Sequence, residues 1–519
     1  MKAHLMYRDQ DFLLSGDLPW GSDTLIEDLE LNTLFSAMCA GDAFLLDVAR
    51  KAVMTSLHDP EQIIYRQDVL RDCMANATTV RVLYGIAMEA IEIEKKSYFG
   101  FFNRYPAAIL NSARELMQAF IAVLVKLREV ADHAASDFRS EGFTDFFSMI
   151  QRELGDDYFE TLKEHLKELQ FRHGTLISAG LGKGNKGISY VLRKPNELDR
   201  NLLKRLFQRR PRSLTFQIAE RDEAGARALS ELHARGINLV ADAVAQSADH
   251  VLSFFRMLRT ELGFYMGCLN LGNVLDAKGQ RVCYPQPAPV TERRHTFAGL
   301  YDICLSLRLQ TAIVPNGIDA DGADLVVITG ANEGGKSTFL RSIGLAQMMM
   351  QAGMTVGAET FQANVCESQF AHYKREEDAS MTSGKFDEEL VRMNEIADHV
   401  RPNSIVLFNE SFASTNEREG SEVARQIVLA LLERHVKVFF VTHMYEFAHG
   451  LYETMKTGAV FLRAERREGG ERTFRVSPGE PLETSYGEDL YQQIFTEDTN
   501  AACGRHFDAG AHQCRGTHL

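Results

Sequence analysis

The chain has 519 residues, of which 45% are hydrophobic and 25% charged, and its formal net charge is −14. This length allows two to four domains with sizeable cores. The negative charge excludes a protein that coats nucleic acid over its whole surface, although it leaves room for a local basic footprint.

The sequence shows no signal for a membrane or for export. We find no uninterrupted apolar run of the roughly 18–20 residues that a bilayer-spanning helix needs, and charges in the first residues argue against a secretory signal. The eight cysteines are scattered singly, which suits a reducing compartment. We therefore expect a cytoplasmic protein with no membrane partner.

The first half of the chain is predicted to be helical. Asp59 followed by Pro60 is a typical helix start. Apolar residues recur at helical spacing between residues 111 and 130, and a second amphipathic stretch covers 223–262. Between these stretches, residues 171–195 combine alternating β-branched residues with a glycine-rich turn, which predicts a β-hairpin inserted among helices.

An α/β region follows. Residues 324–329 (DLVVIT) form an apolar run typical of a buried strand, and further strands are expected at 404–408 and 436–441. Strands separated by helices predict a mostly parallel sheet.

The stretch VVITGANEGGKSTFLRS contains the pattern G-x-x-x-x-G-K-S, from Gly330 to Ser337, between a predicted strand and a predicted helix. Such a loop turns its backbone N–H groups toward phosphate, and the helix adds its positive N-terminus. Lys336 would then reach the β- and γ-phosphates of ATP, and the Ser337 hydroxyl would ligate Mg²⁺. The alternative is a glycine-rich turn that only connects a strand to a helix.

Three later stretches fit the same chemistry. SIVLFNE places Glu410 after Asn409, where an ATPase usually carries the aspartate that steers Mg²⁺. VKVFFVTH ends in His443, which would sense the γ-phosphate unless it is a structural histidine. MTSGKFDEEL places Ser383 and Gly384 ahead of a predicted helix N-terminus. We expect this anion-binding helix end to act in trans, in a homodimer that encloses two ATP molecules.

The order and wording of these motifs resemble the ATPase domain of the MutS family of DNA mismatch repair proteins, within the ABC-like ATPases. The matching stretches are TGANEGGKST, SGK, LFNES followed by STNEREG, VTH and SYG. Upstream, DLELNTLFSAM and SLHDPEQIIYRQDVL resemble the start of that family's helical core. The resemblance covers roughly residues 22–490. It implies an α/β plus all-α fold, in which an elongated helical core and lever domain with a small β-containing insertion precedes an ABC-like P-loop ATPase domain.

The resemblance also assigns roles to residues of this chain. Nucleotide contacts are expected from Gly330, Ala331, Asn332, Glu333, Gly334, Gly335, Lys336, Ser337 and Thr338. Catalysis is assigned to Glu410, His443 and Lys336, and the metal site to Ser337 and Asn409. The trans signature, which would face the ATP of the partner chain, comprises Ser383, Gly384 and Lys385. Ser414 and Thr415 would lie at the interface of the dimer.

The expected domains are an N-terminal segment (1–21), a first core and lever part (22–155), a basic clamp-like insertion (156–215), a second core part (216–300), the ATPase domain (301–490) and a tail (491–519). Mismatch readers of the family insert a phenylalanine from a Phe-x-Glu motif into DNA, and that motif does not occur here before Phe386. The sequence therefore resembles a truncated form without the mismatch-recognition and connector domains. Cysteines and histidines in the tail predict either a zinc site or, more simply, a flexible terminus.

Asn409 predicts an ATPase that is slow and depends strongly on Mg²⁺, rather than one without activity. An amide oxygen still accepts a hydrogen bond from a metal-bound water, and Glu410 is retained to activate the attacking water. The lost charge would cost roughly 1–3 kcal/mol, or one to two decades in rate.

Basic residues gather between positions 183 and 212, opposed only by Glu197 and Asp199. We expect double-stranded or structured DNA to bind there through its phosphates, with strong salt dependence and little sequence preference. The alternative is a solvated helix face. The residues are Lys183, Lys186, Arg193, Lys194, Arg200, Lys204, Arg205, Arg209, Arg210 and Arg212.

Two functions follow from these patterns. The first is a DNA-associated ATPase that dimerises around ATP and couples nucleotide state to opening and closing on DNA, in mismatch repair or a related process. The second is a nucleotide-switched protein scaffold that does not bind DNA. The SGK signature excludes the ATPase subunit of a membrane transporter.

Overall fold

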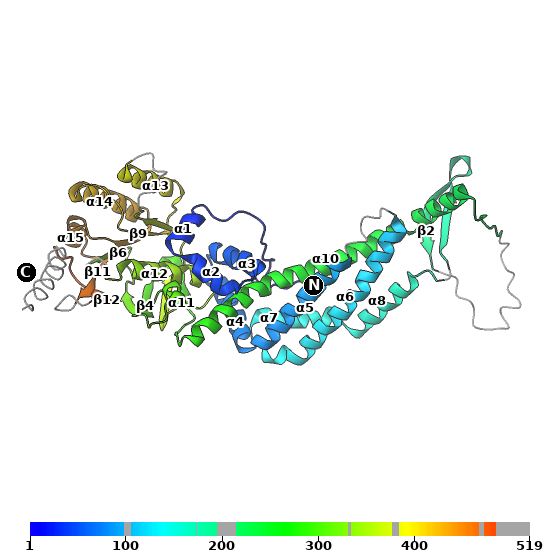
Figure 1. Ribbon diagram of the computed structural model, residues 1–519, viewed down its shortest axis with the longest axis horizontal. Coiled ribbons are helices and arrows are strands. Elements are labelled where there is room, and N and C mark those ends of the chain that lie inside the picture. Colours follow the sequence, from blue (N-terminus) through cyan, green and yellow to red (C-terminus); the bar gives the residue numbers. More distant parts are fainter. Residues whose placement is uncertain are drawn as a thin grey trace, which may run out of the picture. The chain divides into compact units, whose positions relative to one another are not determined.

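The computed structural model describes residues 1–97, 105–172, 174–194, 214–330, 334–375, 384–466 and 472–483. The chain forms two compact units, and the elements of each are labelled in Figure 1. The first unit comprises Met1–Gly16, Asp42–Ala49 and Tyr65–Leu269, and the second comprises Asp17–Gly41, Arg50–Ile64 and Asn270–Leu519. Several predicted residues lie outside the described ranges: Ala331, Asn332, Glu333, Ser383, Arg200, Lys204, Arg205, Arg209, Arg210, Arg212 and the cysteines and histidines of the tail.

The first unit consists mainly of helices, three of which (α3, α4 and α10) also contribute residues to the second unit. They are α3 (Ala43–Met54), α4 (Pro60–Ala75), α5 (Ala77–Ser97), α6 (Pro106–Ala134), α7 (Glu141–Glu153), α8 (Asp156–Glu168) and α10 (Glu223–Ala277). Helix α4 begins at Pro60 as predicted, and the Asp59 carboxylate accepts a hydrogen bond from the Glu61 backbone N–H at 3.0 Å.

Helix α6 corrects one expectation from the sequence. Within the described residues it is the one helix long and apolar enough, by length and composition, to cross a bilayer. The sequence of α6 is not an uninterrupted apolar run, because a few charged residues interrupt a helix that is apolar on average. Phe120, Leu124 and Leu127 of α6 are fully buried, and α6 packs against α5, α7 and α8. The core helix of a soluble protein can be equally long and apolar, so α6 is weak evidence for a membrane span.

A buried carboxylate ties the N-terminal segment to α10 within the first unit. Glu261 is fully buried and accepts hydrogen bonds from the backbone N–H groups of Leu5 at 2.6 Å, Met6 at 3.3 Å and Phe12 at 3.3 Å. Burial raises the pKa of Glu261 to about 7, although these three hydrogen bonds favour its charged form.

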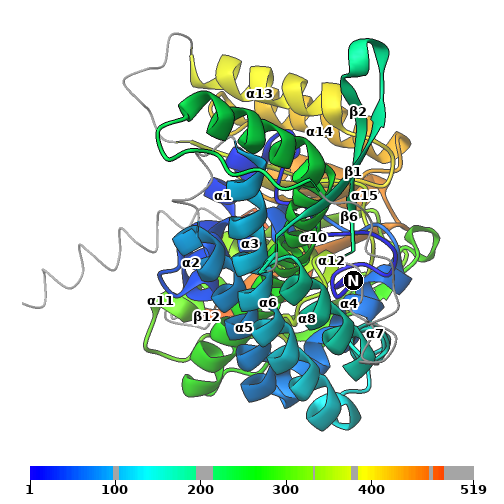
Figure 2. The same ribbon diagram turned by 90° about the vertical axis from the view of Figure 1, so that its right-hand side faces the viewer.

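The predicted hairpin is present in the first unit. Strands β1 (Leu176–Leu181) and β2 (Gly187–Arg193) pair antiparallel, and a short 3-10 turn over Lys183–Asn185 connects them. Figure 2 shows the hairpin beside the first part of α10. A Cβ atom on Gly236 of α10 would lie 2.3 Å from Ile177 Cδ1, so a larger residue at this position would force the Ile177 side chain to move.

The second unit contains two sheets and a set of shorter helices. Its helices are α1 (Ser22–Asp28), α2 (Leu31–Cys39), α11 (Ile303–Arg308), α12 (Lys336–Gln351), α13 (Lys385–His399), α14 (Glu417–Glu433) and α15 (Tyr445–Thr454). Its strands are β3 (Gln286–Ala288), β4 (His295–Leu300), β5 (Asn316–Asp319), β6 (Leu325–Thr329), β7 (Thr360–Asn364), β8 (Gln369–Tyr373), β9 (Ile405–Asn409), β10 (Lys437–Val441), β11 (Ala459–Arg466) and β12 (Arg472–Pro478).

The larger sheet has the order β12-β11-β6-β10-β9-β8, and all its pairs are parallel except β11–β12. The smaller sheet has the order β3-β7-β4-β5. The three strands expected from apolar runs are the buried strands β6, β9 and β10, and the mixed helical and α/β architecture is confirmed. Strand β9 extends one residue beyond the predicted end and includes Asn409.

Parallel pairing brings the carboxyl ends of the central strands to one edge. Val441 of β10 lies opposite Ile328 of β6 on one side and Asn409 of β9 on the other. Tyr373 at the end of β8 lies opposite Asn409 in turn. The residues that follow these four strands therefore meet at the same edge, which is where ligands bind in open α/β sheets.

Candidate functional site

A glycine turn connects β6 to α12. Gly330 has φ 122° and Gly335 has φ 85°, both in the region that favours glycine. A Cβ atom on Gly330 would lie 3.0 Å from the backbone nitrogen and the Cβ of Ala464 in the neighbouring strand β11, so there is no space for a side chain. Helix α12 begins at Lys336, directly after this turn, and directs its N-terminal N–H groups toward the sheet edge.

Lys336 is held at the centre of the site. Its side chain is 4% exposed, its Nζ donates a hydrogen bond to the Gly330 carbonyl oxygen at 2.8 Å, and it lies 3.6 Å from Glu410 Oε1. Burial lowers the pKa of Lys336, while the charge of Glu410 opposes that shift. The glycine turn and the end of β9 are thus joined by one ammonium group.

Ser337 and Asn409 meet beside it. The Ser337 hydroxyl donates to Asn409 Oδ1 at 2.8 Å, which places two neutral oxygen ligands at the end of β9. Within the described residues no group of three or more His, Cys, Asp or Glu side chains could hold a metal ion. Hydroxyl and amide oxygens are ligands that Mg²⁺ accepts, and it usually takes further oxygens from phosphates and water. The donor set therefore fits Mg²⁺ only together with a phosphate ligand.

Glu410 and His443 form a pair at the mouth of the site. His443 Nδ1 is hydrogen-bonded to Glu410 Oε2, and Glu410 has φ 54°, an unusual backbone conformation that functional sites often hold. Burial acts to raise the pKa of Glu410, but the hydrogen bond from His443 and the charge of Lys336 outweigh it and lower that pKa. The same hydrogen bond raises the pKa of His443. Both shifts favour a charged pair.

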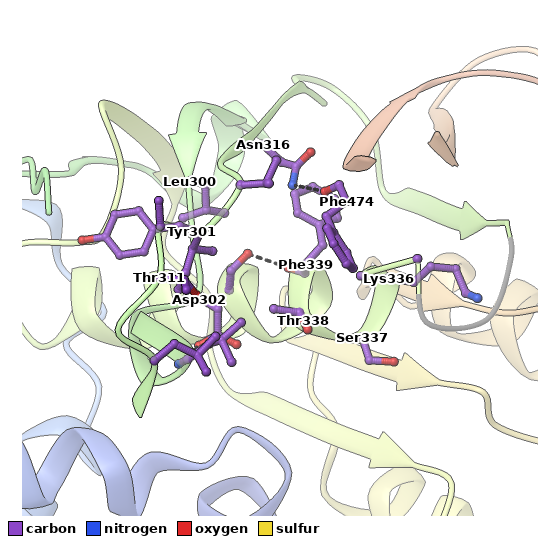
Figure 3. A pocket seen from close by; sticks show the side chains of 18 of the residues that line it. Leu300, Tyr301, Asp302, Thr311, Asn316, Lys336, Ser337, Thr338, Phe339 and Phe474 are labelled. Carbon is purple, nitrogen blue, oxygen red and sulfur yellow. Dashed lines mark hydrogen bonds between the residues drawn. The ribbon is translucent and has the colours of Figure 1, made fainter. Parts of the chain in front are cut away.

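Lys336, Ser337, Glu410 and His443 border a cavity of about 690 Å³ in the second unit. Figure 3 shows Phe474 next to Asn316 and close to Lys336, with Tyr301 and Thr311 on the opposite side. Asn316 Nδ2 donates to the Phe474 carbonyl oxygen at 3.1 Å, and Asn316 Oδ1 accepts from the Val476 N–H at 2.8 Å. The apolar part of the lining is contributed by Leu300, Leu305, Leu309, Ala312, Ile313, Val314 and Phe474.

The sequence reasoning missed part of this lining. The loop 311–316 precedes the glycine turn and has no recognisable pattern of its own. For the base, the distance from SYG indicates only that Arg475 or Phe474 packs on adenine. Lys374 also lines the cavity. It was missed because nothing in its local sequence links it to the ends of β6, β9 and β10.

The expected trans signature lies apart from this cavity. Gly384 precedes the first residue of α13, Lys385, and neither residue lines the cavity. Ser414 donates to Glu389 Oε1 at 3.0 Å and Thr415 donates to Glu419 Oε2 at 2.7 Å, again without contributing to the lining. The structure therefore does not bring these four residues together with the glycine turn of the same chain.

The described basic residues of the insertion are all exposed and belong to the first unit. Lys183 and Lys186 lie in the turn between β1 and β2, and Arg193 at the end of β2 donates to Ser178 Oγ at 3.0 Å. Lys194 Nζ lies 3.8 Å from Glu168 Oε1. Large apolar side chains are exposed in the same region, and they include Leu181, Phe216 and Leu239.

Two family sequence models match most of the chain. The model of the MutS2 N-terminal domain matches residues 58–278, and that of MutS domain V matches residues 326–493, which contain the glycine turn, Glu410 and His443. The chain belongs to the MutS family.

Several MutS-family proteins share moderate identity with this chain. The DNA mismatch repair protein MutS of Lactobacillus acidophilus is 26% identical over 266 residues, which cover 48% of this chain and 31% of that protein. The MutS protein homolog 4 of Homo sapiens is 28% identical over 196 residues (36% of this chain, 21% of that protein). The Endonuclease MutS2 of Lachnoclostridium phytofermentans is 33% identical over 127 residues (24% and 16%). The matched stretch thus spans about a third or less of these relatives' own length.

Proposed function

We propose that this MutS-family chain is an ATPase of the ABC-like P-loop type, which binds ATP with Mg²⁺ in the cavity and hydrolyses it to ADP and phosphate. One observation carries this proposal. Lys336, Ser337, Glu410 and His443 come from three segments of the sequence and line one cavity at the carboxyl edge of a parallel sheet, together with Gly334 and Gly335, and Asn409 is hydrogen-bonded to Ser337 beside it. A glycine turn before a helix N-terminus is a ready anion site.

ATP fits this arrangement with its phosphates over the turn and its base on the apolar side. Lys336 would move its ammonium from Gly330 and Glu410 to the β- and γ-phosphates. The loop 311–316 and Phe474 would surround the base, because such surfaces favour stacking and apolar contact. Ser337 and Asn409 would hold Mg²⁺, which neutralises charge on the phosphates when bound.

We assign the activation of the attacking water to Glu410. Its lowered pKa keeps it ionised, so its carboxylate orients the water and accepts the proton that the water loses as the bond to the γ-phosphorus forms. His443 orients that carboxylate through their hydrogen bond, and we assign to it the contact that senses the γ-phosphate. Because Asn409 adds no negative charge to the metal site, we propose that turnover is slow.

We further propose that two chains enclose two ATP molecules. Gly384 and Lys385, at the N-terminus of α13, and Ser414 and Thr415 face no part of the cavity of their own chain. A second copy would therefore present them, with Ser383, to the nucleotide of the first. Closure around ATP is a means of coupling nucleotide state to a change in the helical unit.

The proposed target of this switch is DNA, in mismatch repair or a related process in the cytoplasm. The relative from Lactobacillus acidophilus is named as a DNA mismatch repair protein, and the exposed basic residues around the hairpin suit contacts with phosphates. A nucleotide-switched protein scaffold is the second candidate. It is favoured by the exposed Leu181, Phe216 and Leu239 in the same region, which are 74–79% exposed and suit a protein surface better than a phosphate backbone.

Steady-state phosphate release tests the proposed reaction. The wild-type protein should release phosphate from ATP in the presence of Mg²⁺. Glu410→Gln should bind ATP without turnover, because the amide is isosteric but does not accept the proton. Lys456→Ala is the matched control, since Lys456 is an exposed lysine of the same unit that does not line the cavity. Equal rates for all three proteins would refute the assignment of Glu410.

A further inference from the structure

Lys374 occupies a fixed place at the sheet edge, although no motif of the sequence marks it. It is the first residue after β8, and its backbone N–H donates to the carbonyl oxygen of Asn409 at 2.9 Å. One residue earlier, Tyr373 of β8 lies opposite Asn409 of β9, so the two strands are paired up to the residue before Lys374. Lys374 is thereby held beside the metal-site residue, and it lines the cavity together with Lys336, Glu410 and His443.

The two lysines of the cavity differ in their environment. Lys336 is buried and bonded to Gly330 and Glu410. Lys374 is exposed, and the described part of the chain provides no hydrogen-bond or ion-pair partner for its ammonium group. The positive charge of Lys374 nevertheless acts on a residue of the site, since it tends to lower the pKa of His443. An ammonium group at this edge is therefore available to a ligand.

The charges that line the cavity favour a strongly anionic ligand. Lys336 and Lys374 contribute positive charge, and the hydrogen bond to Glu410 raises the pKa of His443. Glu410 and Asp302 contribute negative charge, but Asp302 accepts a hydrogen bond from Arg341 Nε and is neutralised by that ion pair. Asn409 is neutral, whereas an aspartate at the same position would offset one of these positive charges. The site thus carries a positive excess before any metal ion binds.

We propose that Lys374 contacts the terminal phosphate of a bound nucleoside triphosphate and supplies part of the charge neutralisation for which a site of this kind otherwise depends on Mg²⁺. The inference rests on the proposed ATP site and goes beyond it in two respects. It assigns selectivity for a triphosphate over a diphosphate to one residue, and it makes nucleotide binding less dependent on the divalent cation. Lysine suits this role as a compact point charge on a flexible stem.

Equilibrium titration of ATP and ADP, with Mg²⁺ and with EDTA, tests the inference without relying on turnover. Lys374→Ala should weaken ATP binding about 10-fold, the range for one charged hydrogen bond, and ADP binding less than about 2-fold. The loss for ATP should be larger in EDTA. Lys374→Arg should retain most of the affinity, and Lys456→Ala should match the wild type. Thermal unfolding should be unchanged in all three variants, because both lysines are exposed.

The outcomes separate this inference from the proposed function. If the wild type binds ATP and Lys336→Ala does not, but Lys374→Ala behaves like Lys456→Ala or weakens ATP and ADP equally, the role of Lys374 is wrong and the ATP site stands. If the wild type binds neither nucleotide, the proposed function fails and the inference fails with it. If EDTA abolishes ATP binding to the wild type, the claim of reduced metal dependence is wrong.

Discussion

The substitution Asn409→Asp restores a charge at the proposed metal site, and we expect it to speed ATP hydrolysis. Asn409 Oδ1 lies 2.8 Å from the Ser337 hydroxyl, so a carboxylate there would lie within a few ångströms of a magnesium ion held by Ser337. A carboxylate and a divalent cation about 4 Å apart attract each other by roughly 8 kcal/mol at an effective dielectric constant of 20. An intervening water and the cost of burying the new charge reduce this to roughly 1–3 kcal/mol, or about 10- to 100-fold in rate.

Phosphate release measured over a range of Mg²⁺ concentrations tests this expectation. The variant should show a higher kcat and should reach half its maximal rate at a lower Mg²⁺ concentration than the wild type. Asn409→Ala is the matched control, because it removes the amide oxygen and should lower the rate further. If Asn409→Asp is slower than the wild type, or if its Mg²⁺ dependence is unchanged, then Asn409 does not serve the metal in the way proposed.

Three further predictions concern other parts of the chain. Gly330→Ala should weaken ATP binding and lower the melting temperature in calorimetry by several degrees, because the left-handed backbone and the contact with Ala464 strain any side chain by about 1–3 kcal/mol; an unchanged melting temperature would contradict the tight turn. Glu261, with a pKa raised from 4.5 to about 7, should contribute stability that is present below pH 4.5 and is lost as the pH rises through 7, by up to ~3 kcal/mol; urea unfolding of Glu261→Gln should lack this part of the pH dependence. Lys183→Ala combined with Lys186→Ala should weaken retention on duplex DNA and reduce its salt dependence, whereas salt-insensitive or absent retention of the wild type would favour the protein scaffold.

The sequence predicted the elements whose signals are local. Apolar runs gave the buried strands β6, β9 and β10, and a motif of eight residues located the glycine turn. The long helix α10 was predicted only as far as residue 262, although it extends to Ala277. Gly263 and the glycines after it lower helix propensity, but the burial of Tyr265 and Leu269 overrides that preference.

The composition of the cavity could not be predicted in the same way. Lys374 reaches the site because β8 pairs with β9, and Phe474 reaches it because Asn316 bonds to the backbone of β12. These contacts depend on strand order and register between segments that are 35 residues apart for Lys374 and Asn409 and 158 residues apart for Asn316 and Phe474, which no local pattern records. Lys374 therefore became a candidate only once the sheet was known, and only the structure distinguishes Phe474, which lines the cavity, from Arg475.

The most direct test of the central claim is the equilibrium binding of ATP to the wild-type protein and to Lys336→Ala, measured by calorimetry in the presence of Mg²⁺. The arrangement of Lys336 at the glycine turn predicts one ATP per wild-type chain and no detectable binding by the variant. Unchanged binding by Lys336→Ala, or no uptake of ATP by the wild type, would show that the cavity is not a nucleotide site.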